Sequence, residues 1–423
     1  MTYQRGLQNL TFGLSVGAAT AALAIAFLMI AVAGQPAQAQ TFQVIHTFTG
    51  GGDGATPWAG VTLDKAGNLY GTAAAGGIGY GTVYRLQHKG SGWIFSPLYS
   101  FTGGVDGDFP LARVIFGPDD SLYGTTVSGA GGPGTVFKLR AQATACKTSL
   151  CSWAETVLYR FSALFNYHPD AEVIFDQAGS LYSTTLYSGS GDCPEGCGVV
   201  FELMPPGSWN METVLYSFSG NDGEHPNGVI FDNAGNLYGT TRAGGLGGYG
   251  TVFELMYPGW SQQCSLYDFR RGNDGGDLYA GLIFDQSGNL YGATSNGGSG
   301  GGGTVFELTP LDTCSWTLKT LYSFTGPAGE CGPRGTLAID GAGNLYGTTY
   351  CDGAHNAGNV FKLTYPNWTY TSLYDFTGGN DGANPVSNVV IDGSGNLYGT
   401  ASEGGPAGDC GGFGCGVVWE ITP

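Results

Sequence analysis

The sequence predicts an all-β fold, a seven-bladed β-propeller with four-stranded blades, and two observations lead to it. The hexapeptide "GNLYGT" or a close variant occurs seven times, at intervals of 52–59 residues, which suits one four-stranded blade. No segment after residue 40 has a helical hydrophobic period, and the repeated segments are rich in Val, Ile, Thr, Tyr and Phe. The leucines of the hexapeptide are Leu69, Leu122, Leu181, Leu237, Leu290, Leu345 and Leu397.

The fourth repeat unit illustrates the expected order of elements. A first strand, "NGVIFD" (227–232), leads through a turn into a second strand, "NLYGTT" (236–241). After a glycine-rich loop come a third strand, "TVFEL" (251–255), and a fourth, "WSQQCSLYDF" (260–269). Gly, Asp and Asn bound these segments, as expected for short strands joined by tight turns.

The turn before the hexapeptide explains why a tyrosine-centred sequence is repeated. In six units an Asp begins this turn and a Gly ends it, so that the Asp caps backbone N–H groups and the Gly takes the left-handed position. The Leu and Tyr that follow point to opposite faces of the strand, and we expect both faces to be buried between blades. The next Gly is expected to leave room where the blades converge. The turn residues are Asp64/Gly67, Asp176/Gly179, Asp232/Gly235, Asp285/Gly288, Asp340/Gly343 and Asp392/Gly395.

The two ends of the repeat region indicate how the ring closes. Six fourth strands read "LYSF" or close to it, each with a Trp a few residues earlier, and a seventh copy, "FQVIHTF", stands at residues 42–48. The last unit stops after its third strand, "GVVWEI". Pairing of these segments would complete the last blade and remove two exposed strand edges. We therefore expect one domain over residues 40–423, closed by the N-terminal strand as the outer strand of the last blade.

Residues 1–39 have the composition of a secretory signal peptide. Arg5 provides a positive start, an apolar run extends over about 14–33, and "GQPAQAQ" supplies small residues for cleavage near Ala39. An uncleaved membrane anchor is the alternative. Because no second apolar span follows, we expect a secreted or periplasmic protein with no membrane span in the mature chain.

Charge and cysteines restrict the function classes. A net charge of −18 with only 15 Lys and Arg argues against binding to nucleic acid. Ten cysteines fit disulfides in an exported protein better than a zinc site, which needs tighter Cys and His clusters. The expected pairs are Cys146–Cys151, Cys193–Cys197, Cys410–Cys415, Cys331–Cys351 and Cys264–Cys314. We predict no cofactor, no metal site and a monomer.

The repeat also resembles a known family. The pattern "DxxGNLYGTTxxGG…GTVFEL…W…LYSF" resembles the GloVer tandem repeat of exported bacterial proteins, and its seven copies cover nearly all of residues 40–423. The strand order and the Trp of the fourth strand also resemble kelch repeats. Many GloVer proteins have varied C-terminal anchors, whereas this chain ends at "ITP" without a hydrophobic or sorting tail. The resemblance implies a propeller in an exported protein and implies no particular activity.

A second acidic series lies in the loops that join the fourth strand of one unit to the first strand of the next. We expect these loops and the glycine-rich loops after "LYGTT" to form one rim of the propeller. Aspartates beside exposed aromatic side chains suit sugar hydroxyls, and turn formation is the alternative role. Units three and six lack the Asp-Gly pair, so a pocket is expected to differ there. The acids are Asp53, Asp106, Asp222, Asp274 and Asp381.

Two histidines precede the loop proline in adjacent units. His168 ("NYHPD") and His225 ("GEHPN") are expected to converge on the rim near Glu224 and Asp170, where such a cluster can perform general acid–base chemistry. Two exposed loop histidines are the alternative. No Ser-His-Asp signature, phosphate loop or HExxH motif occurs in the sequence.

The sequence therefore favours an exported, non-catalytic binding module that recognises a polysaccharide or a cell-envelope protein through its loop rim. The first alternative is a secreted polysaccharide or ester lyase or hydrolase that uses His168, His225 and Glu224. The second is a purely structural surface repeat protein, for which we expect a flat, glycine-lined rim without a pocket.

Overall fold

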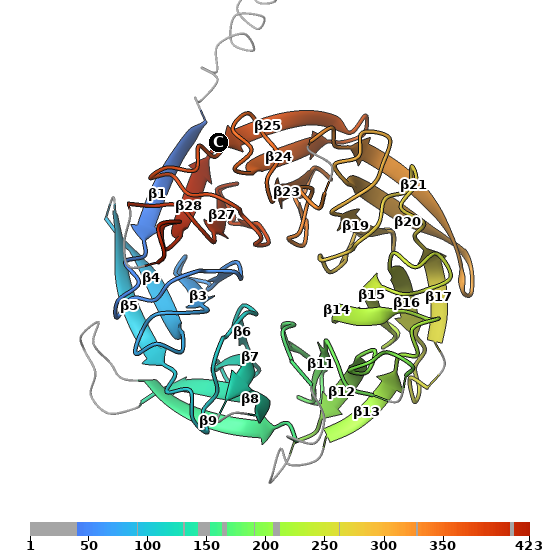
Figure 1. The fold of residues 1–423 in the computed structure, drawn as a ribbon, viewed down its shortest axis with the longest axis horizontal. Coiled ribbons are helices and arrows are strands. Elements are labelled where there is room, and N and C mark those ends of the chain that lie inside the picture. Colours follow the sequence, from blue (N-terminus) through green and yellow to red (C-terminus); the bar gives the residue numbers. More distant parts are fainter. Residues whose placement is uncertain are drawn as a thin grey trace, which may run out of the picture. The chain divides into compact units, whose positions relative to one another are not determined.

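Seven four-stranded antiparallel sheets are arranged around one axis as the blades of a propeller, as the repeat predicts (Figure 1). The computed structural model describes residues 40–90, 92–129, 132–142, 153–162, 167–189, 191–205, 212–261, 263–326, 329–406 and 410–423. The predicted signal peptide therefore lies outside the described residues. In the part of the chain that is described, no helix is long and apolar enough to cross a membrane.

Each of the first six blades uses four consecutive strands, with the first strand nearest the axis (Figure 1). Blade 1 contains β2 (Thr62–Leu63), β3 (Leu69–Ala73), β4 (Thr82–Lys89) and β5 (Gly92–Ser100). Blade 2 contains β6 (Ile115–Phe116), β7 (Leu122–Gly129), β8 (Gly132–Ala141) and β9 (Trp153–Arg160). Blade 3 contains β10 (Ile174–Phe175), β11 (Leu181–Thr185), β12 (Val199–Leu203) and β13 (Glu212–Ser217).

The same order continues through the second half of the ring. Blade 4 contains β14 (Glu224–Phe231), β15 (Leu237–Ala243), β16 (Thr251–Leu255) and β17 (Gln263–Asp268). Blade 5 contains β18 (Ile283–Phe284), β19 (Leu290–Thr294), β20 (Thr304–Asp312) and β21 (Ser315–Ser323). Blade 6 contains β22 (Ala338–Ile339), β23 (Leu345–Thr349), β24 (Asn359–Thr364) and β25 (Thr369–Asp375).

Blade 7 closes the ring with strands from both ends of the propeller. Its strands are β26 (Val390–Ile391), β27 (Leu397–Ala401), β28 (Val417–Thr422) and β1 (Thr41–Thr47). The outer strand β1 pairs with β28, and directly after it the Phe48 N–H donates to the carbonyl of Gly416 at 3.0 Å. Figure 1 shows β1 (blue) beside β28 (red). The closure predicted from the repeat phase is confirmed.

The Asp of the hairpin turn caps backbone N–H groups, as the sequence predicts. In blade 1, one oxygen of the Asp64 carboxylate accepts the N–H groups of Ala66 and Asn68, both at 2.8 Å. The other oxygen accepts the Tyr70 hydroxyl at 3.2 Å. The turn and the hexapeptide tyrosine are therefore one hydrogen-bonded unit. The same contacts begin at Asp232, Asp285, Asp340 and Asp392.

The Gly after the hexapeptide tyrosine has a different role from the one expected. A Cβ at Gly124 would stand 2.7 Å from the ring of Phe137, its partner on the neighbouring strand. Gly71 and Gly399 likewise make room for Tyr84 and Trp419. The glycine therefore accommodates a buried aromatic ring of the third strand in its own blade, rather than a neighbouring blade at the axis.

The repeated Tyr and Trp hold adjacent blades together. The hexapeptide tyrosine of one blade contacts the Trp of the next, as in Tyr70–Trp153, where the ring centroids are 6.4 Å apart. The same contact joins Tyr398 of blade 7 to Trp93 of blade 1 at 5.8 Å, across the ring closure. Contrary to the sequence interpretation, Trp260 and Trp368 precede their fourth strands instead of lying within them. They reach the interface from the turn before the strand.

Four of the five expected cysteine pairs are disulfides: Cys193–Cys197, Cys264–Cys314, Cys331–Cys351 and Cys410–Cys415. The pair Cys146–Cys151 lies outside the described residues. Disulfides persist in oxidising compartments, so these bonds are consistent with an extracellular or periplasmic protein.

Candidate functional site

A cavity of about 160 Å³ lies at the centre of the ring. Its wall is built from all seven blades, by the segments that lead from the loop proline into each first strand. In an antiparallel blade, the loops between the second and third strands open on the same face as these segments. We call this face the loop face; it corresponds to the rim expected from the sequence.

One position of the cavity wall differs in chemistry from blade to blade. This axial position directly follows the loop proline or, before blade 5, Leu278. In blade order the axial residues are Trp58, Leu111, Asp170, Asn227, Tyr279, Arg334 and Val386. The ring therefore has an apolar side at blades 7, 1 and 2, and a polar side at blades 3 to 6. The repeated scaffold presents seven different side chains to one small space.

A buried threonine of the preceding blade fixes the backbone beside most axial positions. The threonine after "LYG", or after "LYS" in blade 3, donates its hydroxyl to a carbonyl of the next blade at 2.8–3.2 Å. Six of the first strands contain only two residues, shorter than the predicted segment. The donor–acceptor pairs are Thr72–Ala112, Thr125–Ala171, Thr184–Pro226, Thr240–Ala280, Thr348–Ser387 and Thr400–Ala59.

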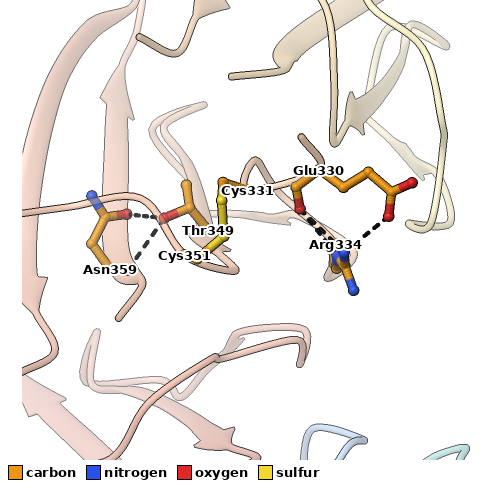
Figure 2. Close-up of a disulfide and its surroundings, with 6 residues drawn as sticks. All are labelled: Glu330, Cys331, Arg334, Thr349, Cys351 and Asn359. Atoms are coloured by element: carbon orange, nitrogen blue, oxygen red, sulfur yellow. Dashed lines mark hydrogen bonds and ion pairs between the residues drawn. A yellow bond between two sulfur atoms is a disulfide. The ribbon is translucent and has the colours of Figure 1, made fainter. Parts of the chain in front are cut away.

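The loop that enters blade 6 is held differently. Ala293 replaces the threonine, and this loop also lacks the Asp-Gly pair. Instead, the Cys331–Cys351 disulfide joins the loop to the segment after β23, and the Cys351 N–H donates to the Cys331 carbonyl at 3.1 Å. Figure 2 shows this disulfide beside Glu330 and Arg334. The covalent bond therefore fixes the turn that presents Arg334 to the cavity.

Arginines and tyrosines form a cluster at this side of the cavity. The guanidinium carbon of Arg242 lies 3.8 Å from the centre of the Tyr279 ring. That of Arg334 lies 4.7 Å from the Tyr279 ring and 3.9 Å from the Tyr350 ring. The Glu330 carboxylate accepts the Tyr279 hydroxyl at 2.7 Å and an N–H of Arg334 at 3.1 Å. Cation–π contacts and hydrogen bonds thus hold both guanidinium groups in place.

Two acidic residues line the cavity beside blade 3. Asp170 is half-buried at the cavity wall, and its partial removal from water raises the pKa of its carboxyl from 3.8 to about 6, although the positive charge of Arg242 acts in the opposite direction. Glu172 forms an ion pair with Arg113 of the blade 2 wall. Asp170 is therefore the acidic group of the wall whose charge changes near neutral pH.

The two loop histidines converge, as expected, on either side of one tyrosine. The rings of His168 and His225 lie 5.2 Å and 5.1 Å from the Tyr187 ring. His225 Nε2 lies 3.5 Å from a carboxylate oxygen of Glu224. Burial lowers the pKa of both histidines. The structure thus brings His168, His225 and Glu224 together at the rim, whereas Asp170 faces the central cavity.

The Asp-Gly acids hold their own loops and lie on five separate blades. Asp106 accepts the Thr102 N–H at 2.8 Å and the Tyr99 hydroxyl at 2.9 Å. Burial alone would raise its pKa, but these hydrogen bonds outweigh it and lower the pKa. Asp53, Asp222, Asp274 and Asp381 accept a loop N–H in the same way, at 2.7–3.0 Å. None of the five is among the residues that line the cavity.

Apolar side chains are exposed on the loop face of blades 7, 1 and 2. Trp58 is 42% exposed, and Phe413 is 73% exposed on the loop closed by Cys410–Cys415. The members of this apolar patch are Trp58, Ile78, Tyr80, Val105, Phe109 and Phe413. Trp58 belongs both to this set and to the axial ring.

Of the axial residues the sequence analysis named only Asp170, as an acid near the loop histidines, and it did not find the arginine–tyrosine cluster. The sequence patterns are those that the units share, whereas the axial position is one at which the units differ. An alignment of the seven units on the loop proline, with Leu278 at that place in one unit, would have shown this position. The two loops without Asp-Gly do supply the charged axial residues Asp170 and Arg334.

The family model of the Gloeobacter/Verrucomicrobia repeat matches residues 34–152, 142–330 and 256–423. The chain belongs to this repeat family. The GloVer resemblance predicted from the hexapeptide is thus confirmed over the whole propeller. No curated protein matches this Gloeobacter/Verrucomicrobia repeat protein.

Several solved structures are similar to the repeat protein at low identity. The PQQ-bound aldose sugar dehydrogenase of Streptomyces coelicolor is 13% identical, with a TM-score of 0.44, and the match covers 92% of this chain and 100% of that one. A gluconolactonase of Xanthomonas campestris is 12% identical, with a TM-score of 0.43 and coverage of 93% and 92%. A protein of unknown function from Dyadobacter fermentans is 11% identical, with a TM-score of 0.46 and coverage of 91% and 99%.

Proposed function

We propose that this protein is an exported binding module that takes one unit of a polysaccharide into the central cavity. The observation that carries the proposal is the ring of seven different axial residues on an otherwise repeated scaffold. A purely structural repeat protein needs no such divergence at the wall of a cavity.

The chemistry of the ring fits a sugar. Asp170, Asn227 and Arg334 offer acceptors and donors for hydroxyl groups, while Trp58 offers an apolar face to the carbon-bound hydrogens of a pyranose ring. Small-molecule sites generally combine such an apolar surface with a few fixed polar groups. The mixed ring therefore favours a polyhydroxylated ligand over a lipid or a purely ionic one.

The size of the cavity favours one unit of a longer chain. Its volume of about 160 Å³ is below the roughly 300–1,000 Å³ typical of sites that enclose a whole small molecule. The exposed Trp58 and Phe413 of the apolar patch offer stacking surfaces to the units outside the cavity. A cell-envelope protein, the other partner expected from the sequence, would instead need a large interface.

Trp58→Ala is the direct test. We expect this substitution to weaken binding of the best glycan on an array by about tenfold or more, because large aromatic side chains dominate such contacts. Calorimetry on residues 40–423 measures the change, and Leu311→Ala, an exposed apolar residue at the β20–β21 turn, is the control. Wild-type protein that binds no glycan, or equal affinity of Trp58→Ala and wild type, contradicts the proposal.

The His168–Tyr187–His225 cluster favours a lyase or hydrolase as the second candidate function. If the wild type cleaves any polysaccharide or ester in a substrate panel, the double substitution His168→Asn/His225→Asn should lower kcat by about 100-fold or more. Asn is the suitable replacement because both histidines have φ near +50°, at 44° and 59°, which Asn tolerates. Undiminished turnover in the double variant excludes this cluster as the catalytic site.

A further inference from the structure

Arginines gather on the loop face of this acidic chain. Arg113 and Arg334 line the cavity, and Arg242 stacks on the cavity residue Tyr279. In contrast, Lys89 ends β4 on the opposite face of the propeller. With a net charge of −18, the chain has an excess of carboxylates available to pair with its cations. A cation at the cavity without such a partner is therefore informative.

Arg242 stacks on the wall residue Tyr279 and has no direct ion pair, although the charges of Asp170 and Asp277 act on it from further away. Arg113, Arg271 and Arg334 each form an ion pair, with Glu172, Asp277 and Glu330 respectively. Among the described residues, Arg242 has no carboxylate oxygen within ion-pair distance; it bonds the Tyr279 hydroxyl and lies over the Tyr279 ring. An arginine held by an aromatic ring keeps N–H donors free for a further acceptor.

Glu330 shows that the donors of Tyr279 and Arg334 can bind a carboxylate. Its Oε2 accepts hydrogen bonds from both Tyr279 and Arg334. The side chain is 41% exposed, and its backbone has φ 64°, which is unfavourable for a non-glycine residue. The carboxylates of Asp170 and Asp277 also act on Arg242, so the acidic side chains here balance the guanidinium groups. A ligand carboxylate would therefore bind through the N–H donors of Arg242 that no protein carboxylate reaches, and would compete with Glu330 for Arg334.

We infer that Arg242, supported by Arg334, recognises the carboxylate of a uronic acid unit in the bound glycan. This inference rests on the proposed function and names the ligand class of the same site. A planar carboxylate matches the fork of a guanidinium group with two parallel hydrogen bonds, so the sugar acid is favoured over a neutral sugar of the same shape. A sulfated sugar presents a related anion but lacks this planar match.

The experiment compares acids with their own esters. The probes are oligomers of galacturonate, mannuronate and glucuronate, each with its methyl ester, which removes the charge and keeps the ring. We expect the wild type to bind at least one acid about tenfold more tightly than its ester. The preference should shrink in high salt. Sulfated galactose oligomers form the third arm, and tighter binding of these than of any uronate overturns the assignment to a carboxylate.

Three substitutions give different expected results. Arg242→Gln should bring the acid-to-ester ratio close to one. Glu330→Gln should raise affinity for the acid severalfold, because the internal carboxylate no longer competes for Arg334. Lys89→Gln, which removes the same charge on the opposite face, should keep the wild-type ratio. Arg242→Gln should weaken binding of the acid and Glu330→Gln should strengthen it. A general loss of folding would weaken binding in both variants.

The outcomes separate this inference from the proposed function. Binding of neutral glycans or esters without any preference for the acid overturns the uronate assignment and leaves glycan binding intact. A tenfold preference that persists in Arg242→Gln overturns the role of Arg242. Binding of no glycan in any arm overturns the proposed function and this inference with it.

Discussion

Phe48→Ala is expected to lower the free energy of unfolding by about 3–5 kcal/mol and to open the ring between blades 7 and 1. Phe48 is 1% exposed, directly after β1, and packs on Tyr84 of blade 1 at 5.3 Å between ring centroids. It belongs to one core cluster with Val418 of β28 and Leu86 of β4. The substitution therefore leaves a cavity where the two ends of the propeller meet.

Hydrogen exchange and chemical denaturation measure the two parts of this prediction. The matched control is Phe218→Ala, because Phe218 is also fully buried after an outer strand and packs on Phe253 at 5.0 Å within one continuous part of the chain. Both variants should lose similar stability. Only Phe48→Ala should accelerate exchange in β1 and β28. Identical exchange patterns in the two variants would show that the ring closure is no weaker than any other blade.

Asp170→Asn is expected to stabilise the protein by about 2 kcal/mol at pH 8 and to have little effect at pH 4. Burial raises the pKa of Asp170 from 3.8 to about 6. Between pH 3.8 and about 6, the carboxyl of Asp170 is therefore protonated in the native state and ionised in the unfolded state. Stability contributed by the protonated carboxyl is complete below pH 3.8 and is lost as the pH rises through about 6.

Denaturant titrations of the wild type and Asp170→Asn at both pH values measure this difference. The exposed Asp192→Asn corrects for the loss of one negative charge in an acidic protein. Equal destabilisation by Asp170→Asn at pH 4 and pH 8 would contradict the prediction. It would show that the native carboxylate is stabilised by Arg242 more than it is destabilised by burial.

The fold could be predicted from the sequence because each blade repeats its local chemistry. The turn Asp and the hexapeptide tyrosine form local hydrogen bonds that recur around the ring. The order of the strands at the two ends, "FQVIHTF" and "GVVWEI", predicts the pairing that closes it. Strand ends were predicted less well. The sequence reveals neither that six of the first strands contain only two residues nor that a threonine donates to a carbonyl of the next blade, as Thr240 does to Ala280.

The candidate site was only partly predictable. The rim, the convergence of His168 with His225, and the distinct loops of units three and six follow from position within the repeat. The Arg242–Tyr279–Arg334 cluster does not, because it joins three blades and depends on the curvature of the ring. The Asp-Gly acids recur in five loops, and each of them forms the hydrogen bonds that hold its own loop. Recurrence therefore marks a structural role that these loops share.

The covalent link between Cys331 and Cys351 has a consequence for how Arg334 is held. The loop that carries Glu330 and Arg334 lacks both the threonine bond and the Asp-Gly hydrogen bonds that hold other loops, and the disulfide adds a covalent link to the backbone hydrogen bonds of Gly332. Thiols stay reduced in the cytoplasm. In a reducing compartment this bond would be absent, and Arg334 would then be held by its hydrogen bonds to Glu330 and by its contacts with the Tyr279 and Tyr350 rings.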